Sequence, residues 1–208
     1  MATIENSAEA ASLSAASQQQ DQAQVEALLT QHRAYLCQVV KARMNPAMGR
    51  RVDASDVVQE AQIEAVRNLD AFLQDPQVPV KIWLRKLAIQ RLIMAERKHL
   101  GAAQRAVGRE RQAPRTSIDV AHQLSTGLLS PSQIVSQRER TEAVRQTLDR
   151  LPEIDREIIL MHLYEGLTSQ ESAAALGIEP AAARKRLGRA VQRLKRALES
   201  QNLRESSL

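Results

Sequence analysis

The 208-residue sequence is poor in aromatic residues, in glycine and proline, and in cysteine. Aromatic residues make up 2% of the chain while hydrophobic residues make up 43%, so a core must be built from Leu, Ile, Val and Ala, which favours helices over strands. Seven glycines and seven prolines are too few for the many tight turns of an all-β fold. The single cysteine, Cys37, excludes an internal disulfide and a cysteine-rich zinc site.

The sequence also lacks a long apolar run. None reaches the roughly 18 residues that a membrane span needs, and the first 20 residues have neither the basic start nor the apolar stretch of a signal peptide. We therefore expect no membrane insertion and a cytoplasmic location. The net charge of +5 and the pI of about 9.8 favour a polyanionic partner.

Hydrophobic periodicity predicts an all-α fold with two small helical domains joined by a flexible linker. The first domain, residues 21–100, contains helical patterns over 25–40, 52–72 and 82–100. Residues 101–129 hold three glycines and a proline without sustained periodicity, and we interpret them as the linker. The second domain covers 130–200, with a capping pattern at 130–133. Residues 1–20 and 201–208 are expected to be tails, the former disordered.

The end of the second domain has the pattern of a helix-turn-helix. Thr168 and Glu171 form a capping box that opens a short helix, and Gly177 ends it. Pro180 then stands at the first position of a final helix. In such a motif the second helix enters the major groove by its N-terminal end.

The final helix is basic along one side. On a wheel of 100° per residue, its apolar residues share one face and Lys185, Arg189 and Arg196 lie near the opposite pole, with no acidic residue between Pro180 and Leu198. A charge stripe of one sign suits a phosphate backbone, although a basic surface helix of a bundle is the alternative. The residues expected to reach DNA are Ala181, Ala182, Arg184, Lys185, Arg186 and Arg189.

The segment "LPEIDREIILMHLYEGLTSQESAAALGIEPAAARKRLGRAVQRLKRAL" resembles region 4 of bacterial sigma factors, of the extracytoplasmic-function (ECF) type. The resemblance implies that this domain recognises the −35 promoter element. It also implies promoter DNA and core RNA polymerase, through the β flap and the β′ clamp helices, as partners. An anti-sigma factor is a further partner that ECF factors commonly have.

The segment "DASDVVQEAQIEAVRNLDAF" is similar to region 2.2 of the same family. The resemblance implies that Asp56, Gln59 and Glu60 bind the coiled coil of the β′ clamp. Between Asp53 and Asp75 there are six acidic residues and one basic residue, which favours a protein partner over DNA. A solvated acidic face is the alternative interpretation of these charges.

The helix predicted over 82–100 falls where the family binds the −10 element as a single strand. The resemblance implies DNA contacts by Arg85, Lys86, Gln90, Arg91, Arg97 and Lys98. Family members often carry an Asp near Met94, so that carboxylate is lost here, and Gln62 replaces a usual large apolar residue. Trp83 either packs in the core, which we favour, or stacks on a base.

Two other classes of protein compete with this interpretation. An enzyme is disfavoured because the four histidines are scattered and no phosphate loop, nucleophile elbow or His-Glu-x-x-His motif is present. We therefore expect no catalytic residue, no cofactor, no metal and no small-molecule substrate. A dimeric repressor or activator with a helix-turn-helix is the second alternative, but it leaves the Asp-Val-Val-Gln-Glu helix unexplained.

Overall fold

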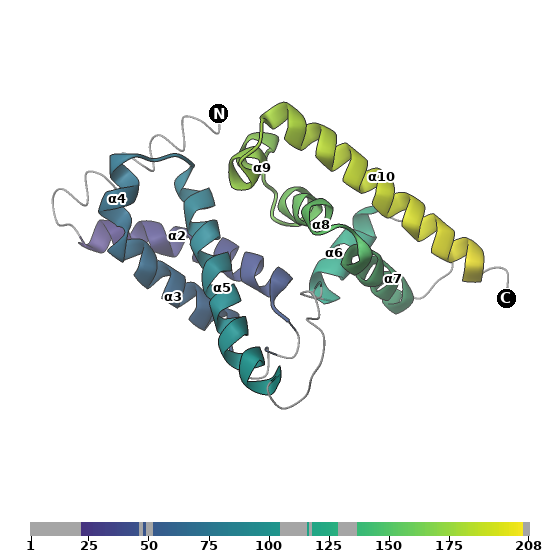
Figure 1. Ribbon diagram of the computed structural model, residues 1–208, viewed down its shortest axis with the longest axis horizontal. Coiled ribbons are helices and arrows are strands. Elements are labelled where there is room, and N and C mark those ends of the chain that lie inside the picture. Colours follow the sequence, from purple (N-terminus) through teal and green to yellow (C-terminus); the bar gives the residue numbers. More distant parts are fainter. Residues whose placement is uncertain are drawn as a thin grey trace. The chain divides into compact units, whose positions relative to one another are not determined.

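A computed structural model describes residues 22–45, 48, 52–104, 116, 118–128 and 137–205 of the chain. Within these ranges all regular structure is helical, which confirms the all-α prediction (Figure 1). The chain divides into two compact units, one formed by residues 1–41 and 47–109 and the other by 42–46 and 110–208. The predicted tail 1–20 and the capping pattern at 130–133 lie outside the described residues.

The first unit contains α2 (Gln22–Arg43, up to Lys41), α3 (Ala54–Arg67), α4 (Leu69–Gln74) and α5 (Val80–Gln104). Asp53 caps α3 by accepting a 2.7 Å hydrogen bond from the backbone N–H of Ser55. The single helix predicted over 52–72 is wrong, because the chain breaks at Asn68, whose φ of −107° and ψ of 10° are not helical. The Asn68 side chain donates to the Glu64 carbonyl at 2.9 Å, which competes with continuing the helix.

The core of the first unit is aliphatic. Its buried side chains come mainly from α2, α3 and α5 and include Leu36, Val39, Val40, Val57, Val58, Ala61, Leu84 and Ala88. Phe72 and Trp83 stack with ring centroids 4.2 Å apart and planes 9° from parallel, so one face of the indole is covered by protein. This stacking favours the packing interpretation of Trp83.

A polar network joins α2 to α3. Gln62 accepts a hydrogen bond from Arg33 at 3.1 Å and donates to the Leu29 carbonyl at 2.8 Å. Arg33 also donates to Ser55 at 2.5 Å. Gln62, which stands where the family usually has an apolar residue, therefore has a structural role, because it supplies both a donor and an acceptor between two helices.

The second unit contains α6 (Ile118–Leu128), α7 (Gln137–Arg150), α8 (Glu153–Ile159), the π-helical turn η1 (Leu160–Tyr164), α9 (Ser169–Leu176) and α10 (Pro180–Glu205). Figure 1 shows α10 extending past α9, α8 and α7. Its apolar core is built mainly from buried side chains of α6, α7, α8 and α10. Helix α10 continues to Glu205, so the segment predicted as a tail from residue 201 begins as part of this helix.

The prediction of a linker over 101–129 is wrong in part, because this segment contains helix α6. Val120, Ala121 and Leu124 are at most 3% exposed and pack in the core of the second unit, against α7. The chain just before α6 is also fixed to the second unit, because the backbone N–H of Thr116 donates to the carboxylate of Asp149 at 2.7 Å. At the other end of the predicted linker, α5 continues to Gln104.

Asp149, which holds Thr116, is itself oriented by Arg145 of α7. Arg145 donates to Asp149 at 3.2 Å and to Glu142 at 2.8 Å. The hydrogen bond that Arg145 donates to Glu142 raises the pKa of Arg145; burial opposes this, and the charges of Glu142 and Asp149 add to it. A permanently charged guanidinium thus fixes the carboxylate that caps the segment before α6.

Candidate nucleic-acid and protein interfaces

Helices α9 and α10 form a two-helix motif with a short turn. The Thr168 hydroxyl accepts from the Glu171 N–H at 3.2 Å, and the Glu171 carboxylate accepts from the Thr168 N–H at 2.8 Å. This confirms the predicted capping box. Gly177 ends α9 with φ of +64°, a conformation that glycine adopts without steric cost, so the predicted turn is also confirmed.

Small side chains let the two helices pack closely. Ala173 of α9 and Ala183 of α10 are 2% and 1% exposed in the shared core. The Ile178 N–H donates to the Ala173 carbonyl at 3.1 Å, which closes the turn on α9. The first turns of α10 are therefore held rigidly on the second unit, while their outer side remains open.

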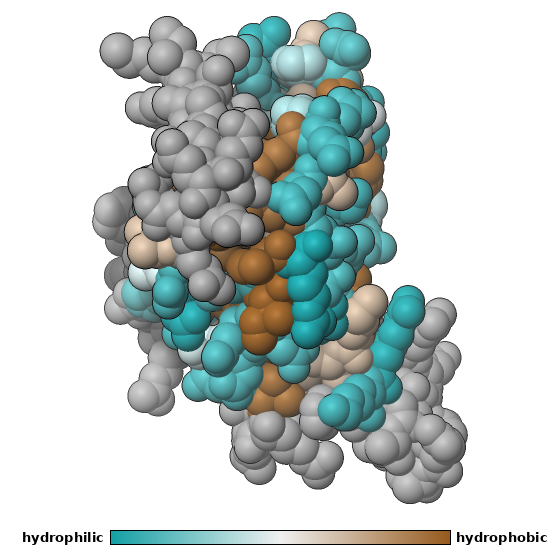
Figure 2. All heavy atoms as spheres, turned by 90° about the vertical axis from the view of Figure 1, so that its left-hand side faces the viewer, coloured by the Kyte–Doolittle hydropathy of each residue, from teal (hydrophilic) through white to brown (hydrophobic). Residues whose placement is uncertain are grey.

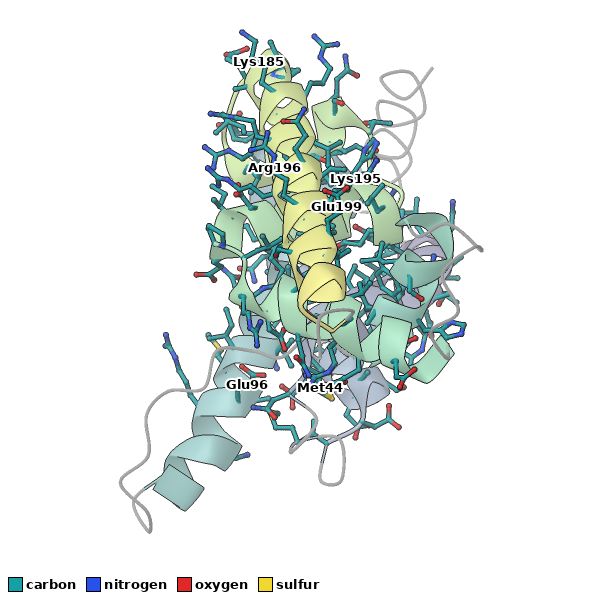
Figure 3. All side chains as sticks on the ribbon, turned by 90° about the vertical axis from the view of Figure 1, so that its right-hand side faces the viewer. Met44, Glu96, Lys185, Lys195, Arg196 and Glu199 are labelled. Carbon is teal, nitrogen blue, oxygen red and sulfur yellow. The ribbon has the colours of Figure 1, made fainter. Side chains whose placement is uncertain are left out.

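The two sides of α10 differ sharply. Its inner side is apolar, with Ala183, Ala190, Leu194 and Leu198 buried and Leu187 and Val191 partly buried, as the helical wheel predicts. Figure 3 shows Lys185 near the start of α10 and Lys195, Arg196 and Glu199 further along it. Lys185, Lys195 and Arg196 are exposed. Sequence reasoning left Lys195 and Arg196 out of the binding set.

The structure places the predicted −35 residues on this open side. Ala181, Ala182, Arg184, Lys185 and Arg189 are exposed, and Arg186 is half-buried. Arg193 lies on the flank, where it forms an ion pair with Asp155 of α8, whose carboxylate side chain is 5% exposed. Arg193 therefore belongs to the basic side of α10 but already has an acidic partner within the protein.

The exposed side of α3 has a different character. Asp56, Gln59 and Glu60 are exposed, and at helical spacing they share this side with Ile63 and Val66, which are 47% and 51% exposed. Figure 2 shows a band of apolar side chains between hydrophilic ones on the side of the molecule where α3 and α4 lie. Carboxylates beside exposed aliphatic groups suit a protein surface and repel DNA.

Sequence reasoning did not single out Ile63 and Val66. The sequence does contain a sign of their exposure, because at helical spacing both residues lie outside the apolar stripe of Val58, Ala61 and Ala65, which is buried. An aliphatic residue outside the core stripe is ordinary when alone. Two of them beside the predicted contacts on one helix face are informative.

The predicted −10 residues on α5 divide into two groups. Lys86, Gln90, Arg97 and Lys98 are exposed, whereas Arg91 is half-buried and donates to Glu64 of α3 at 2.5 Å. Arg85 is 5% exposed and lies away from the other residues at helical spacing. The structure therefore brings four of the six onto one open surface, together with the exposed apolar residues Ile93 and Met94.

The described part of the chain has neither a membrane-spanning helix nor a cluster of metal ligands. No described helix combines the length and apolarity needed to cross a bilayer. Among the same residues, no three His, Cys, Asp or Glu side chains gather as metal ligands. The candidate interfaces of the described chain are therefore the exposed surfaces of α3, α5 and α10.

Comparison with known proteins assigns a family to each unit. A family model described as Sigma-70 region 2 matches residues 28–100, and one described as Sigma-70, region 4 matches residues 141–194. Together the two matches cover more than half of the chain.

Individual relatives agree with this assignment. The ECF RNA polymerase sigma factor SigD of Mycobacterium tuberculosis is 28% identical over 155 residues, which are 74% of this chain and 68% of SigD. The RNA polymerase sigma factor CnrH of Cupriavidus metallidurans is 28% identical over 173 residues, which are 83% of this chain and 85% of CnrH.

A solved structure is similar in fold. The structure of CnrH in complex with the cytosolic domain of CnrY matches with a TM-score of 0.55 and 22% identity, over 92% of this chain and 96% of that chain. With a region 2 match on the first unit, a region 4 match on the second and ECF factors as relatives, the chain belongs to the sigma-70 family, as an ECF-type sigma factor that binds RNA polymerase and directs transcription initiation at promoters.

Proposed function

We propose that the two units divide promoter recognition between them, the second unit binding the −35 element and the first binding both core polymerase and the −10 element. The observation that carries this proposal is the open side of α10, where exposed cations follow the closed turn of a helix-turn-helix. Such a helix enters the major groove by its N-terminal end, so Ala181, Ala182 and Lys185 face base edges. Arg184 and Arg189 then reach phosphates.

Residues at the start of α10 supply two kinds of base contact. A Lys or Arg pairs with guanine O6 and N7, and an Ala methyl contacts a thymine methyl. Arg186 is half-buried, so its guanidinium reaches DNA from the flank of the helix, while Lys185 projects from the open side. This arrangement supports a −35 element that combines guanine with thymine.

The open side of α3 is the proposed docking surface for the β′ clamp helices. Asp56, Gln59 and Glu60 supply carboxylate and amide groups at the N-terminal half of the helix. Ile63 and Val66 add apolar area next to them, which a charged contact alone lacks. Burying these two aliphatic side chains contributes affinity, and the carboxylates contribute orientation and specificity.

The open side of α5 is the proposed contact for the melted −10 strand. Lys86 and Arg97 suit phosphates, and Gln90 suits a base edge. Ile93 and Met94, exposed between them, offer apolar surface for unstacked bases. Arg91 and Arg85 are left out of this surface, because one is engaged with Glu64 and the other is buried. Contacts of this kind offset the few kcal/mol needed to unstack a base.

An anti-sigma factor and the β flap are the further partners that we propose. CnrH has been solved with the cytosolic domain of CnrY, and this chain is similar to CnrH over most of both lengths. An inhibitor that covers α3 and α10 would block polymerase and DNA together. The β flap would bind the second unit, as the family resemblance implies.

Transcription with purified core polymerase tests the proposed function. Core reconstituted with this protein is supplied with genomic DNA, and the 5′ ends of the transcripts are mapped. We expect initiation at sites that share two elements, with transcription lost when either is scrambled. Initiation at no site, with the protein alone protecting a palindromic duplex, would instead support a dimeric repressor or activator.

Docking through α3 is tested separately with the double substitution Gln59→Ala and Glu60→Ala. We expect loss of co-purification with core polymerase and an unchanged melting temperature, because both side chains are exposed and outside the core. A matched control is Gln31→Ala with Glu26→Ala, which removes the same groups from exposed positions on α2. Equal binding of core by the two double variants would refute the docking surface.

A further inference from the structure

Gly188 lies within α10 on its exposed side. The helix runs without a break from Pro180 to Glu205, and the positive φ angles among the described glycines occur at Gly166 and Gly177 instead. A glycine inside a helix destabilises it relative to alanine, because glycine loses more backbone freedom on folding. The backbone conformation of α10 therefore gives no reason for glycine at this position.

Packing within the protein gives no reason either. A Cβ atom built on Gly188 would meet nothing within 4 Å, apart from the helix backbone and the adjacent residues. A glycine that serves close helix packing would instead place its Cβ against a neighbouring element. The described fold has room for a side chain at residue 188, so packing within the described chain does not require glycine there.

The surface around Gly188 is positively charged. Arg184 and Lys185 lie one turn before it, Arg189 follows it directly, and Gln192 lies one turn after it, all four exposed. None of the three cations forms an ion pair with any other part of the chain that the structure describes. Figure 3 shows Lys185, Lys195 and Arg196 along α10, and the first carboxylate after Pro180 is that of Glu199.

We propose that the sugar–phosphate backbone of promoter DNA lies directly against α10 at Gly188. The missing Cβ lets a strand approach the helix axis more closely, by about the width of a methyl group. Arg184 and Arg189, which flank Gly188, then reach phosphates on both sides of the contact. A protein partner of acidic character would match the same charges, but the position of Gly188 two turns into a helix-turn-helix recognition helix favours DNA.

This contact fixes how deeply α10 enters the groove. Phosphate contacts position a protein on the duplex, whereas contacts to base edges read its sequence. Gly188 is thus a positioning residue for the side chains of Ala181 and Lys185 at the bases. The inference rests on the proposed function, because it requires α10 to be the helix that binds promoter DNA.

The test uses the full chain reconstituted with core polymerase on a duplex promoter that the wild-type holoenzyme uses. Gly188→Ala adds a methyl group and Gly188→Leu adds a larger side chain, both into space that the fold leaves open. Ser200→Leu is the matched control, an equally bulky residue at an exposed position of α10 about three turns further on. Melting temperature, promoter affinity and its salt dependence are measured for each.

We expect Gly188→Ala to raise the melting temperature by about 2–6 °C, because alanine favours the helix. The same variant binds the promoter several-fold more weakly. Gly188→Leu weakens binding by about tenfold or more and reduces the slope of log K against log [salt] by about one, as expected when one phosphate no longer reaches its cation. Ser200→Leu leaves affinity and slope unchanged.

Each other outcome has a definite meaning. If both Gly188 variants bind promoter DNA as the wild type does, the proposed contact is wrong while the proposed function stands. If Gly188→Leu loses transcription with unchanged DNA affinity, a protein covers Gly188 and the DNA assignment is overturned. If the wild-type holoenzyme initiates at no promoter, the proposed function fails and the inference fails with it.

Discussion

Two cations of α10 differ in their contacts within the protein. We therefore expect their removal to affect different properties, DNA binding in one case and stability in the other. Lys185 is exposed and forms no ion pair with the described chain, whereas Arg193 pairs with the nearly buried carboxylate of Asp155. We therefore expect Lys185→Ala to change DNA binding without changing stability. We expect Arg193→Ala to lower stability, with little effect on the salt dependence of DNA binding.

The magnitudes follow from the interaction that each substitution removes. Each phosphate contact contributes about −0.9 to the slope of log K against log [salt], which is a loss of about 3.5-fold in affinity between 50 and 200 mM salt. If Lys185 binds a phosphate, Lys185→Ala weakens binding at both salt concentrations, and the loss at 50 mM salt is about 3.5 times the loss at 200 mM. If Lys185 binds a base, affinity falls by about 1–3 kcal/mol and only for the matching sequence. Removing Arg193 leaves Asp155 without this partner, at a cost of about 1–3 kcal/mol.

The assay measures the affinity of the reconstituted holoenzyme for one promoter duplex at several salt concentrations. The same duplex with a scrambled −35 element separates the base contact of Lys185 from a phosphate contact. Urea denaturation of each free variant gives its stability. The reasoning is refuted if Lys185→Ala and Arg193→Ala change affinity, slope and urea midpoint alike, because the structure assigns only one of these cations an internal partner.

Two further substitutions test local contacts by urea denaturation. Thr168→Ala removes the cap of α9 and should cost about 1 kcal/mol, whereas Glu171→Gln keeps an acceptor for the reciprocal bond and should cost less; equal losses would contradict the capping geometry. Gln62→Leu removes the acceptor of Arg33 and the donor to the Leu29 carbonyl, and should cost about 1–3 kcal/mol. A gain in stability from this leucine would show that apolar packing at this position outweighs the polar network.

Predictions from local sequence signals are correct where the structure depends on nearby residues. Thr168 and Glu171 are three residues apart, and Gly177 ends the helix that they begin, so the motif depends on one short segment. The apolar face of α10 likewise follows from the helical period alone, because one side of the helix is buried along most of its length.

Several differences from the predictions occur where residues distant in the sequence decide the outcome. Helix α6 has three buried apolar residues in its described part and packs on α7, which no pattern within 101–129 reveals. Arg85 and Arg91 have the residue type of a DNA contact, but burial removes one and Glu64 engages the other. The exposed state of Ile63 also depends on where α5 packs against α3, since that packing selects the buried face.

Helix α10 is one uninterrupted helix that contains both the end proposed to bind the −35 element and a major part of the hydrophobic core. Loosening the core at Leu194 or Leu198 therefore also removes the support of the end proposed to contact bases. In a genetic screen, temperature-sensitive alleles are expected at these buried positions as well as at the DNA surface. On warming, such alleles should first lose promoters that depend on a strong −35 element, and should retain longest those with a strong −10 element.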